Sequence, residues 1–279
     1  MKFKSEQEFV ARIQKLAKRR AGGLVRGIGD DAAVIEPPPH QRWCITTDLL
    51  TEGIHFDLRF DSPSSVGHKS LAAGLSDLAA MGAIPRFALI SIAVPIRRAT
   101  AFLGPFYQGF LDLADCHKVT LIGGDTSGSR RQIFIDVIVV GCVRAGREIL
   151  RSGARTGDHI FVTGAIGKAA LGLHLLRQGK PASSSMERQA VASHLHPIPR
   201  TGVGLRLGEA RLATSMIDIS DGLSTDLNHL CRESRVGARI HEAHLPLLGK
   251  GRSQRMLKYA LSGGEDYELL FTVSPKRVI

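Results

Sequence analysis

The amino-acid sequence predicts an α+β protein with two domains. The chain has 279 residues, of which 43% are hydrophobic, so it is long enough to bury one large core or two ordinary ones. Segments with helical periodicity and strand-like apolar runs are mixed in both halves, without the strict alternation that predicts a doubly wound sheet. A polar, glycine-containing stretch at 144–158 separates the halves. We therefore expect domains at residues 1–147 and 148–279.

The N-terminal half is expected to begin with a helix. Ser5 and Glu8 have the spacing of a capping box, and apolar residues then recur at helical spacing as far as Ala17. Gly22 and Gly23 are expected to end this helix. The following elements are expected as strands at 32–36 and 42–50, a helix rich in small residues at 64–83, a strand at 86–94, a helix at 102–118 interrupted by Pro105, and strands at 119–125 and 132–143.

The C-terminal half mixes the same two kinds of element. We expect strands at 159–165, 215–220, 238–245 and 267–273, helices at 168–178, 221–234 and 253–261, and a polar surface loop at 179–188. Neither half contains an internal repeat. This mixture supports the α+β class over a doubly wound fold.

Composition excludes several classes of protein. No apolar run approaches 18 residues and the first 20 residues lack the apolar core of a secretory signal, so we expect a cytoplasmic protein with no membrane partner. The four cysteines form no C-x-x-C pair and are interpreted as core residues.

Charge points to anionic partners. Lys and Arg number 37 against 26 Asp and Glu, for a net charge of +11, which favours nucleic acid or small phosphorylated molecules. Aromatic residues make up only 5% and are not interleaved with basic stretches, so a nucleic-acid stacking platform is not favoured. The basic runs "KLAKRR" (15–20) and "PIRRAT" (95–100) are interpreted as solvated faces.

Acidic residues stand out against this basic background. Most of them follow apolar runs or lie in glycine-flanked turns, and one lies in a helix of small residues: Asp30, Asp31, Asp48, Asp77, Asp125, Asp218 and Asp221. Each alone is an ordinary turn or cap residue. Together they favour Mg²⁺, because hard cations take oxygen ligands and are bound by a few carboxylates plus substrate phosphates.

Ready-made nucleotide and metal motifs are not complete. "GAIGKAAL" (164–171) resembles a phosphate-binding loop, but Ala169 stands where that motif needs Ser or Thr. We interpret it as a turn between a strand and a helix. "HLH" (194–196) and "HEAH" (241–244) contain metal-binding side chains without further ligands beside them, so they are weak candidates for a metal site.

The acidic motifs, taken in order, resemble the thiamine-monophosphate kinase family, within a superfamily that also contains aminoimidazole-ribonucleotide synthetase. The segments that carry the resemblance are "GIGDDAAVI", "TTDLLTEGIHF", "SDLAAMGA", "LIGGDTS", "RSGA", "IDISDGLSTDL" and "SGGEDYELLF". The resemblance as a whole spans residues from about 5 to 273, nearly the whole chain. The resemblance implies an enzyme that uses ATP to phosphorylate thiamine monophosphate, giving thiamine diphosphate.

The resemblance also implies roles for individual residues. Several Mg²⁺ ions would be held by Asp31, Thr46, Thr47, Asp48, Asp77, Asp125, Asp218 and Asp221. ATP would be contacted by Tyr107, Gly124, Asp125, Arg151 and Ser220. The thiamine phosphate would be held by His55 and Glu265. Asp30 would shape its turn or support Asp31. No covalent nucleophile is expected, because phosphoryl transfer depends mainly on positioning and charge stabilisation.

The family resemblance implies a further level of structure. An N-terminal mixed α/β sheet domain would bind metal and ATP and would pair with a second copy into a barrel-like homodimer, and an α+β domain would follow. Family members continue for some tens of residues beyond the position of Ile279. The C-terminal domain is therefore expected to be truncated, with an exposed apolar strand edge at 267–273.

Three alternatives remain open on the sequence. One is an ATP-dependent synthetase or kinase of the same superfamily that acts on another phosphorylated substrate. The second is a truncated, inactive relative that still binds nucleotide. The third is a basic nucleic-acid-binding protein, which would have no use for an acidic cluster.

Overall fold

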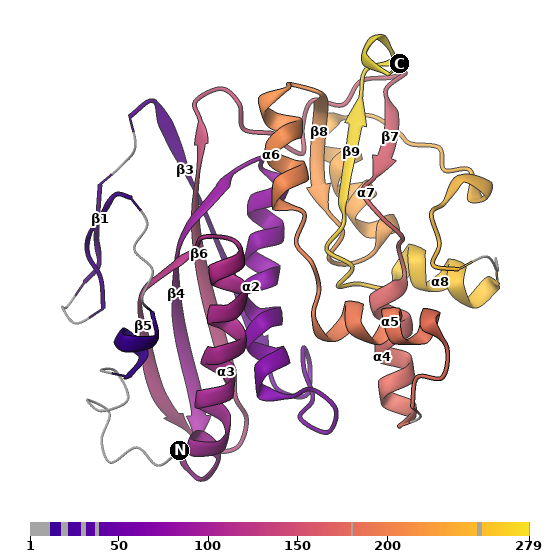
Figure 1. Ribbon diagram of the computed structural model, residues 1–279. Helices are drawn as coiled ribbons and strands as arrows, with labels where there is room; N and C mark the ends of the chain where they lie inside the picture. The colour runs from indigo at the N-terminus through magenta and orange to yellow at the C-terminus, as the bar shows by residue number, and fades with distance from the viewer. Residues whose placement is uncertain are drawn as a thin grey trace. The chain divides into compact units, whose positions relative to one another are not determined.

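The computed structural model describes residues 12–17, 22–28, 32–36, 39–179, 181–249 and 253–278 (Figure 1). The chain forms two compact units. Unit 1 comprises Met1–Gly74 and Pro85–Cys142, and unit 2 comprises Leu75–Ile84 and Val143–Ile279. The segment Leu75–Ile84 thus groups with unit 2 although it lies between the two parts of unit 1 in the sequence, a feature that no sequence pattern indicated.

Unit 1 is built on a four-stranded sheet with the strand order β3-β6-β4-β5. The strands are β3 (Gln41–Thr51), β4 (Ile84–Pro95), β5 (Thr120–Ser129) and β6 (Phe134–Arg144). β4 and β5 are parallel and are joined by helix α3 (Ile96–Cys116). A separate antiparallel pair consists of β1 (Leu24–Arg26) and β2 (Val34–Ile35). The predicted strands at 32–36, 42–50, 86–94, 119–125 and 132–143 are therefore confirmed within a few residues.

Helices α2 (Pro63–Ala80) and α3 cross at two glycines. A Cβ built on Gly67 of α2 would lie 2.0 Å from the Phe106 carbonyl oxygen of α3, and one built on Gly109 would lie 2.0 Å from the Ser64 carbonyl oxygen. Both values are far inside contact distance, so the crossing requires glycine at both positions. Phe106 and Phe110, on the same helix as Gly109, are fully buried in the core.

Helix α3 is longer than expected and continues through Pro105. The predicted interruption is wrong. Proline removes one backbone hydrogen bond, but Phe102, Phe106 and Phe110 bury their rings on one face of the same helix. This packing outweighs the lost bond.

The beginning of the chain is only partly described. Residues 12–16 are helical, in agreement with the predicted first helix. The expected capping pair Ser5 and Glu8 lies outside the described residues, and so do Asp30 and Asp31.

Unit 2 contains a three-stranded antiparallel sheet with the strand order β7-β9-β8. Its strands are β7 (His159–Val162), β8 (Ala213–Asp218) and β9 (Leu269–Val273), and its helices are α4 (Lys168–Gln178), α5 (Ser185–Leu195), α6 (Thr201–Glu209), α7 (Leu223–Ser234) and α8 (Gln254–Ser262). The core of this unit contains Ile166, Ile217, Leu227 and Leu270.

Strand β9 is the central strand, so the predicted exposed apolar edge at 267–273 is wrong. β7 and β8 pair with its two sides, and Leu269 and Leu270 are fully buried. The alternation of apolar residues predicts a strand but does not show how many neighbours it has.

Three further corrections concern the connections in unit 2. The predicted strand at 238–245 is irregular and contains a short 3-10 helix at Glu242–His244. The predicted loop at 179–188 is shorter than expected, because α5 begins at Ser185. Its N-cap Ser184 forms a complete capping box with Glu187. Helix α6 was not predicted, because its sequence contains several glycines, which have a low helix propensity. A Cβ on Gly204 would lie 2.0 Å from the Ala79 carbonyl oxygen, so this glycine allows close packing.

In the described part of the chain, none of the helices has the length and apolar character needed to cross a membrane.

Candidate active site

The predicted residues of strand β3 divide between its two faces. Thr46 and Asp48 are half-buried, whereas Thr47 between them is exposed, as the alternation of a strand requires. The Thr47 hydroxyl donates to Asp136 Oδ1 at 2.6 Å. Asp48 lies beneath α2, where a Cβ on Gly74 would be 3.6 Å from Asp48 Oδ2. The side chains of Thr46 and Asp48 therefore share a face that Thr47 does not.

Strand β5 carries Gly124 and Asp125. A Cβ on Gly124 would lie 2.0 Å from the Ile90 carbonyl oxygen of β4, so only glycine allows this close approach. Asp125 is exposed, and its Oδ1 accepts the Thr126 backbone N–H at 2.9 Å. Its carboxylate is thus held at the strand surface and is open to solvent.

Tyr107 of α3 joins this group through Thr126. Burial raises the pKa of Tyr107, while a hydrogen bond to the Thr126 side chain lowers it, and the net shift is upward. The phenol is therefore neutral at physiological pH. The structure thus brings Tyr107, Gly124 and Asp125 close together within unit 1.

The turn after β3 holds His55. The Thr51 backbone N–H donates to His55 Nδ1 at 3.0 Å, and the His55 backbone N–H donates to the Thr51 carbonyl oxygen at 2.9 Å. Because Nδ1 accepts a hydrogen bond, the neutral ring carries its proton on Nε2. The exposed His55 side chain is therefore a ready hydrogen-bond donor.

In unit 2, a hydrogen bond connects α2 to the end of β8. The Ser76 hydroxyl donates to Asp218 Oδ2 at 2.7 Å, and both residues are buried. Asp77 follows Ser76 in the helix and is half-buried. Ser76 thus connects the predicted residue Asp218 to the helix that carries Asp77. Sequence reasoning missed Ser76, whose only signal was a hydroxyl within an apolar helix.

The loop between β8 and α7 carries Ser220 and Asp221. The backbone N–H groups of Asp221 and Gly222 donate to Asp226 Oδ2, each at 3.1 Å. Burial is the main reason that the pKa of Asp226 rises to about 6. Asp226 thus fixes the loop from inside, and the Asp221 side chain is exposed.

Glu265 lies against the same loop. Its backbone N–H donates to the Ser220 carbonyl oxygen at 2.8 Å. Glu265 and Tyr267 have φ values of 67° and 50°, a left-handed conformation that is uncommon for such residues. Glu265 Oε2 lies 3.2 Å from Nδ1 of the buried His194. His194, from the "HLH" motif, is therefore the partner of the Glu265 carboxylate. Sequence reasoning missed this role.

Asp266 and Glu268 explain why "GAIGKAAL" has no open phosphate loop. The N–H groups of Gly167 and Ala169, at the start of α4, donate to Asp266 at 2.5 and 2.9 Å. A protein carboxylate thus occupies the place where a phosphate would bind at a helix N-terminus. Lys168 forms an ion pair with the fully buried Glu268.

Arg200 completes the neutralisation of Glu268. Its guanidinium donates to both carboxylate oxygens, at 2.7 and 2.6 Å. Burial raises the pKa of Glu268, but the hydrogen bonds and charges of Arg200 and Lys168 outweigh burial, so the net shift is downward. The carboxylate stays ionised inside the unit.

Arg151 lies on an exposed segment, and its carbonyl oxygen accepts a hydrogen bond from the Ser234 hydroxyl at 2.8 Å.

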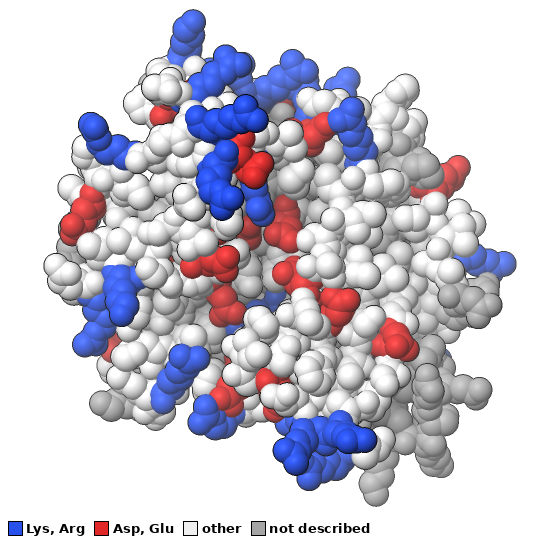
Figure 2. Space-filling model, turned by 180° about the vertical axis from the view of Figure 1, so that it is seen from behind, with Lys and Arg blue, Asp and Glu red and all other residues white. Residues whose placement is uncertain are grey.

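Among the described residues, no three His, Cys, Asp or Glu side chains gather as a metal centre. Acidic side chains do reach solvent among Lys and Arg on the face shown in Figure 2. The available donors are carboxylates and hydroxyls, which suit a hard cation.

The chain matches two family models in sequence. Residues 29–143 match the AIR synthase related protein, N-terminal domain, and residues 155–279 match the AIR synthase related protein, C-terminal domain. Thiamine-monophosphate kinase from Buchnera aphidicola (subspecies Acyrthosiphon pisum) is 38% identical over 283 residues, covering 100% of this chain and 85% of that protein. The chain belongs to the thiamine-monophosphate kinase family. The predicted family and the two-domain fold are thereby confirmed.

Solved structures of thiamine-monophosphate kinases have the same fold. The enzyme from Stenotrophomonas maltophilia K279a superposes with a TM-score of 0.86 at 35% identity, over 95% of this chain and 85% of that one. The structure of AaThiL complexed with AMPPCP and TMP superposes with a TM-score of 0.78 at 34% identity, over 100% of this chain and 89% of that one.

Proposed function

We propose that this protein transfers the γ-phosphoryl group of ATP to thiamine monophosphate, giving thiamine diphosphate. The observation that carries the proposal is the likeness, over the whole chain, to the AaThiL complex with AMPPCP and TMP. The chemistry is a direct in-line transfer, in which the acceptor is a phosphate oxygen that is already ionised at neutral pH. No side chain is needed as a covalent nucleophile.

Mg²⁺ fits the residues that are present, because the donor set consists of oxygens. We assign it to Asp31, Thr46, Thr47, Asp48, Asp77, Asp125, Asp218 and Asp221. Thr47 would contribute its main-chain oxygen, since its hydroxyl is bonded to Asp136. When bound, the ions neutralise the charge on phosphate oxygens. The exposure of Asp125 and Asp221 supports this assignment, since their carboxylates are open to solvent.

Nucleotide binding is assigned to Tyr107, Gly124, Asp125, Arg151 and Ser220. Gly124 exposes its backbone, and Tyr107 carries no charge at neutral pH, so neither repels the nucleotide. Arg151 is exposed, and its guanidinium supplies the planar set of donors that phosphate oxygens accept in pairs.

His55 and Glu265 are assigned to the acceptor, thiamine monophosphate. The proton that His55 carries on Nε2 would be donated to a phosphate oxygen, because Nδ1 is occupied by the Thr51 N–H. The Glu265 carboxylate, placed by His194 and by its left-handed backbone, would face the cationic part of thiamine. The two side chains thus suit opposite charges of one substrate.

A homodimer formed through unit 1 is also proposed. β3 is one of the two edge strands of the four-stranded sheet. Ile45 and Leu49 lie on its exposed face and are 68% and 59% exposed. Apolar side chains on an edge strand favour association with a second sheet. A barrel-like pairing of two copies would cover them.

The test is a transfer assay with purified protein, Mg²⁺ and ATP labelled in its γ-phosphate. We expect label to appear in thiamine diphosphate only when thiamine monophosphate is present. Release of label as inorganic phosphate alone would contradict the proposed acceptor. Transfer to a different phosphorylated substrate would favour another enzyme of the superfamily. Nucleotide binding without any transfer would identify an inactive relative.

A further inference from the structure

A pocket in unit 1 is lined mostly by charged side chains. It has a volume of about 480 Å³ and lies where the start of α3, the turn between β5 and β6 and the turn after β3 meet. Arg97 and Arg98 come from α3, Arg131 from the β5–β6 turn, and Glu52 and Asp57 from the segment after β3. The pocket has no aromatic or aliphatic lining residue, so it cannot recognise a ring or an alkyl chain.

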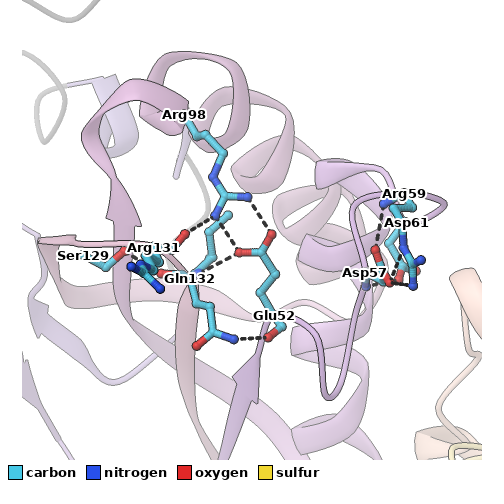
Figure 3. A network of polar contacts seen from close by, with 9 residues as sticks. Glu52, Asp57, Arg59, Asp61, Arg98, Ser129, Arg131 and Gln132 are labelled. Carbon is cyan, nitrogen blue, oxygen red and sulfur yellow. Dashed lines mark hydrogen bonds and ion pairs between the residues drawn. The ribbon is translucent and has the colours of Figure 1, made fainter.

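Both acidic residues of this pocket are already neutralised. Arg98 donates to the two oxygens of Glu52, each at 2.6 Å (Figure 3). The hydrogen bond from Arg98 is the largest cause of the lowered pKa of Glu52. Asp57 accepts two bonds from the Arg59 guanidinium, at 2.8 and 2.5 Å. These pairs leave neither carboxylate available for another cation.

Two guanidinium groups therefore remain uncompensated. The side chains of Arg97 and Arg131 form no hydrogen bond or ion pair with any residue that the structure describes. Both line the same pocket, and like charges that face a shared space repel each other. An anion in the pocket removes this repulsion.

The backbone that carries these arginines is fixed. Arg98 donates to the Arg131 carbonyl oxygen at 2.6 Å, and Gln132 Nε2 donates to the Glu52 carbonyl oxygen at 3.2 Å (Figure 3). The Ser129 hydroxyl donates to the Gln132 carbonyl oxygen at 2.5 Å. Only the Arg97 and Arg131 side chains must be ordered when a ligand binds, which lowers the entropic cost.

We propose that Arg97 and Arg131 form a binding site for a phosphate group, in a pocket that is lined by none of the residues assigned to phosphoryl transfer. Guanidinium groups bind phosphate oxygens in pairs, and two of them match the charge of a phosphate dianion. The ligand is inorganic phosphate or the phosphate end of a larger monoester that leaves its organic part in solvent. The basic run "PIRRAT", interpreted from sequence as a solvated face, thus supplies one side of the site.

The experiment measures phosphate binding to the full chain by calorimetry, at low chloride and without Mg²⁺ or nucleotide. Inorganic phosphate and glycerol phosphate are titrated into wild type and into the Arg97→Gln/Arg131→Gln double variant. We expect saturable binding to wild type and at least about tenfold weaker binding to the double variant, because the variant loses the charged hydrogen bonds of two guanidinium groups. Tighter binding of glycerol phosphate identifies a monoester as the ligand, and tighter binding of phosphate identifies the free ion.

Arg130→Gln is the matched control, because Arg130 is exposed in the same turn but does not line the pocket. It is expected to bind phosphate as wild type does. The proposal is overturned if wild type shows no saturable binding, or if the double variant and the control lose affinity equally. Kinase turnover of the double variant is expected to stay near the wild-type value. The site and the proposed function can therefore fail independently.

Discussion

At the scale of single residues, two kinds of carboxylate carry different tasks. Asp266 and Glu268 are buried and are fully engaged by backbone N–H groups, Lys168 and Arg200, so they build the fold. Asp125 and Asp221 are exposed, so they are available to cations. Burial and hydrogen-bond partners separate the two kinds, although their sequence surroundings are similar.

Loss of a single proposed metal ligand is expected to stop turnover without unfolding the protein. Asp77→Asn and Asp125→Asn each keep the side-chain shape but remove a charge that would hold Mg²⁺. We expect each variant to lose at least about a hundredfold in kcat, or roughly 2.7 kcal/mol of transition-state stabilisation. Labelled-phosphate transfer measures this, with circular dichroism to confirm folding.

Asp112→Asn serves as the control, because Asp112 is exposed on α3, where its carboxylate accepts a hydrogen bond from the Gln108 side chain at 2.7 Å. Its turnover is expected to match wild type. Near-normal rates in both Asp77→Asn and Asp125→Asn would show that the metal assignment is wrong.

Asp266 gives a prediction about pH. Burial is the main cause that raises its pKa from the ordinary 3.8 to about 6. Between pH 3.8 and about 6, the folded state therefore keeps a proton on Asp266 that the unfolded chain has released. The resulting stabilisation is complete below pH 3.8 and is lost as the pH rises through about 6.

The Asp266→Asn variant cannot ionise at this position, so it lacks this pH dependence. We expect the wild-type advantage in free energy of unfolding over this variant to be greatest below the window and to shrink above it. Urea denaturation at pH values below, within and above the window measures the difference. An advantage that grows with pH would contradict the prediction.

At the scale of secondary structure elements, close backbone contacts decide where helices lie. Gly67 and Gly109 allow α2 and α3 to touch, and Gly204 does the same for α6. A sequence read by hydrophobic period alone treats such glycines as interruptions. This is one reason why α6 was not predicted, whereas α4, which has clear helical spacing, was predicted with its observed bounds, Lys168–Gln178.

Gly67→Ala is expected to destabilise the protein by about 1–3 kcal/mol, because its Cβ would collide with the backbone of α3. Gly202→Ala is the matched control, since Gly202 is also helical and a Cβ there meets nothing within 4 Å. We expect that change to stabilise by about 0.5–1 kcal/mol. Thermal or urea unfolding measures both, and equal effects would refute the crossing argument.

At the scale of the whole molecule, the exposed face of β3 leads to a prediction about assembly. Ile45→Glu/Leu49→Glu introduces charges that a sheet-to-sheet interface cannot solvate. We expect wild type to sediment as a dimer and this double variant as a monomer. Ile198→Glu is the control, because Ile198 is 66% exposed but lies in unit 2. A monomeric wild type would contradict the proposed dimer.

The sequence by itself determined the family, the α+β class and most regular elements of this protein. Seven ordered motifs identify the family, and apolar periodicity reports which local segments bury one face. The sequence also singled out the aspartates. It could not determine which of them would be buried partners and which exposed groups, because this depends on residues far apart in the chain.

Tertiary structure alone decided the remaining features. It placed β9 at the centre of its sheet, because strand neighbours are set by long-range pairing. It placed the Asp266 carboxylate, about 100 residues away in sequence, where it accepts hydrogen bonds from backbone N–H groups at the start of α4. It paired Ser76 with Asp218 and His194 with Glu265. It also left Arg97 and Arg131 facing one pocket. Such pairings depend on distances in space, which the order of residues does not contain.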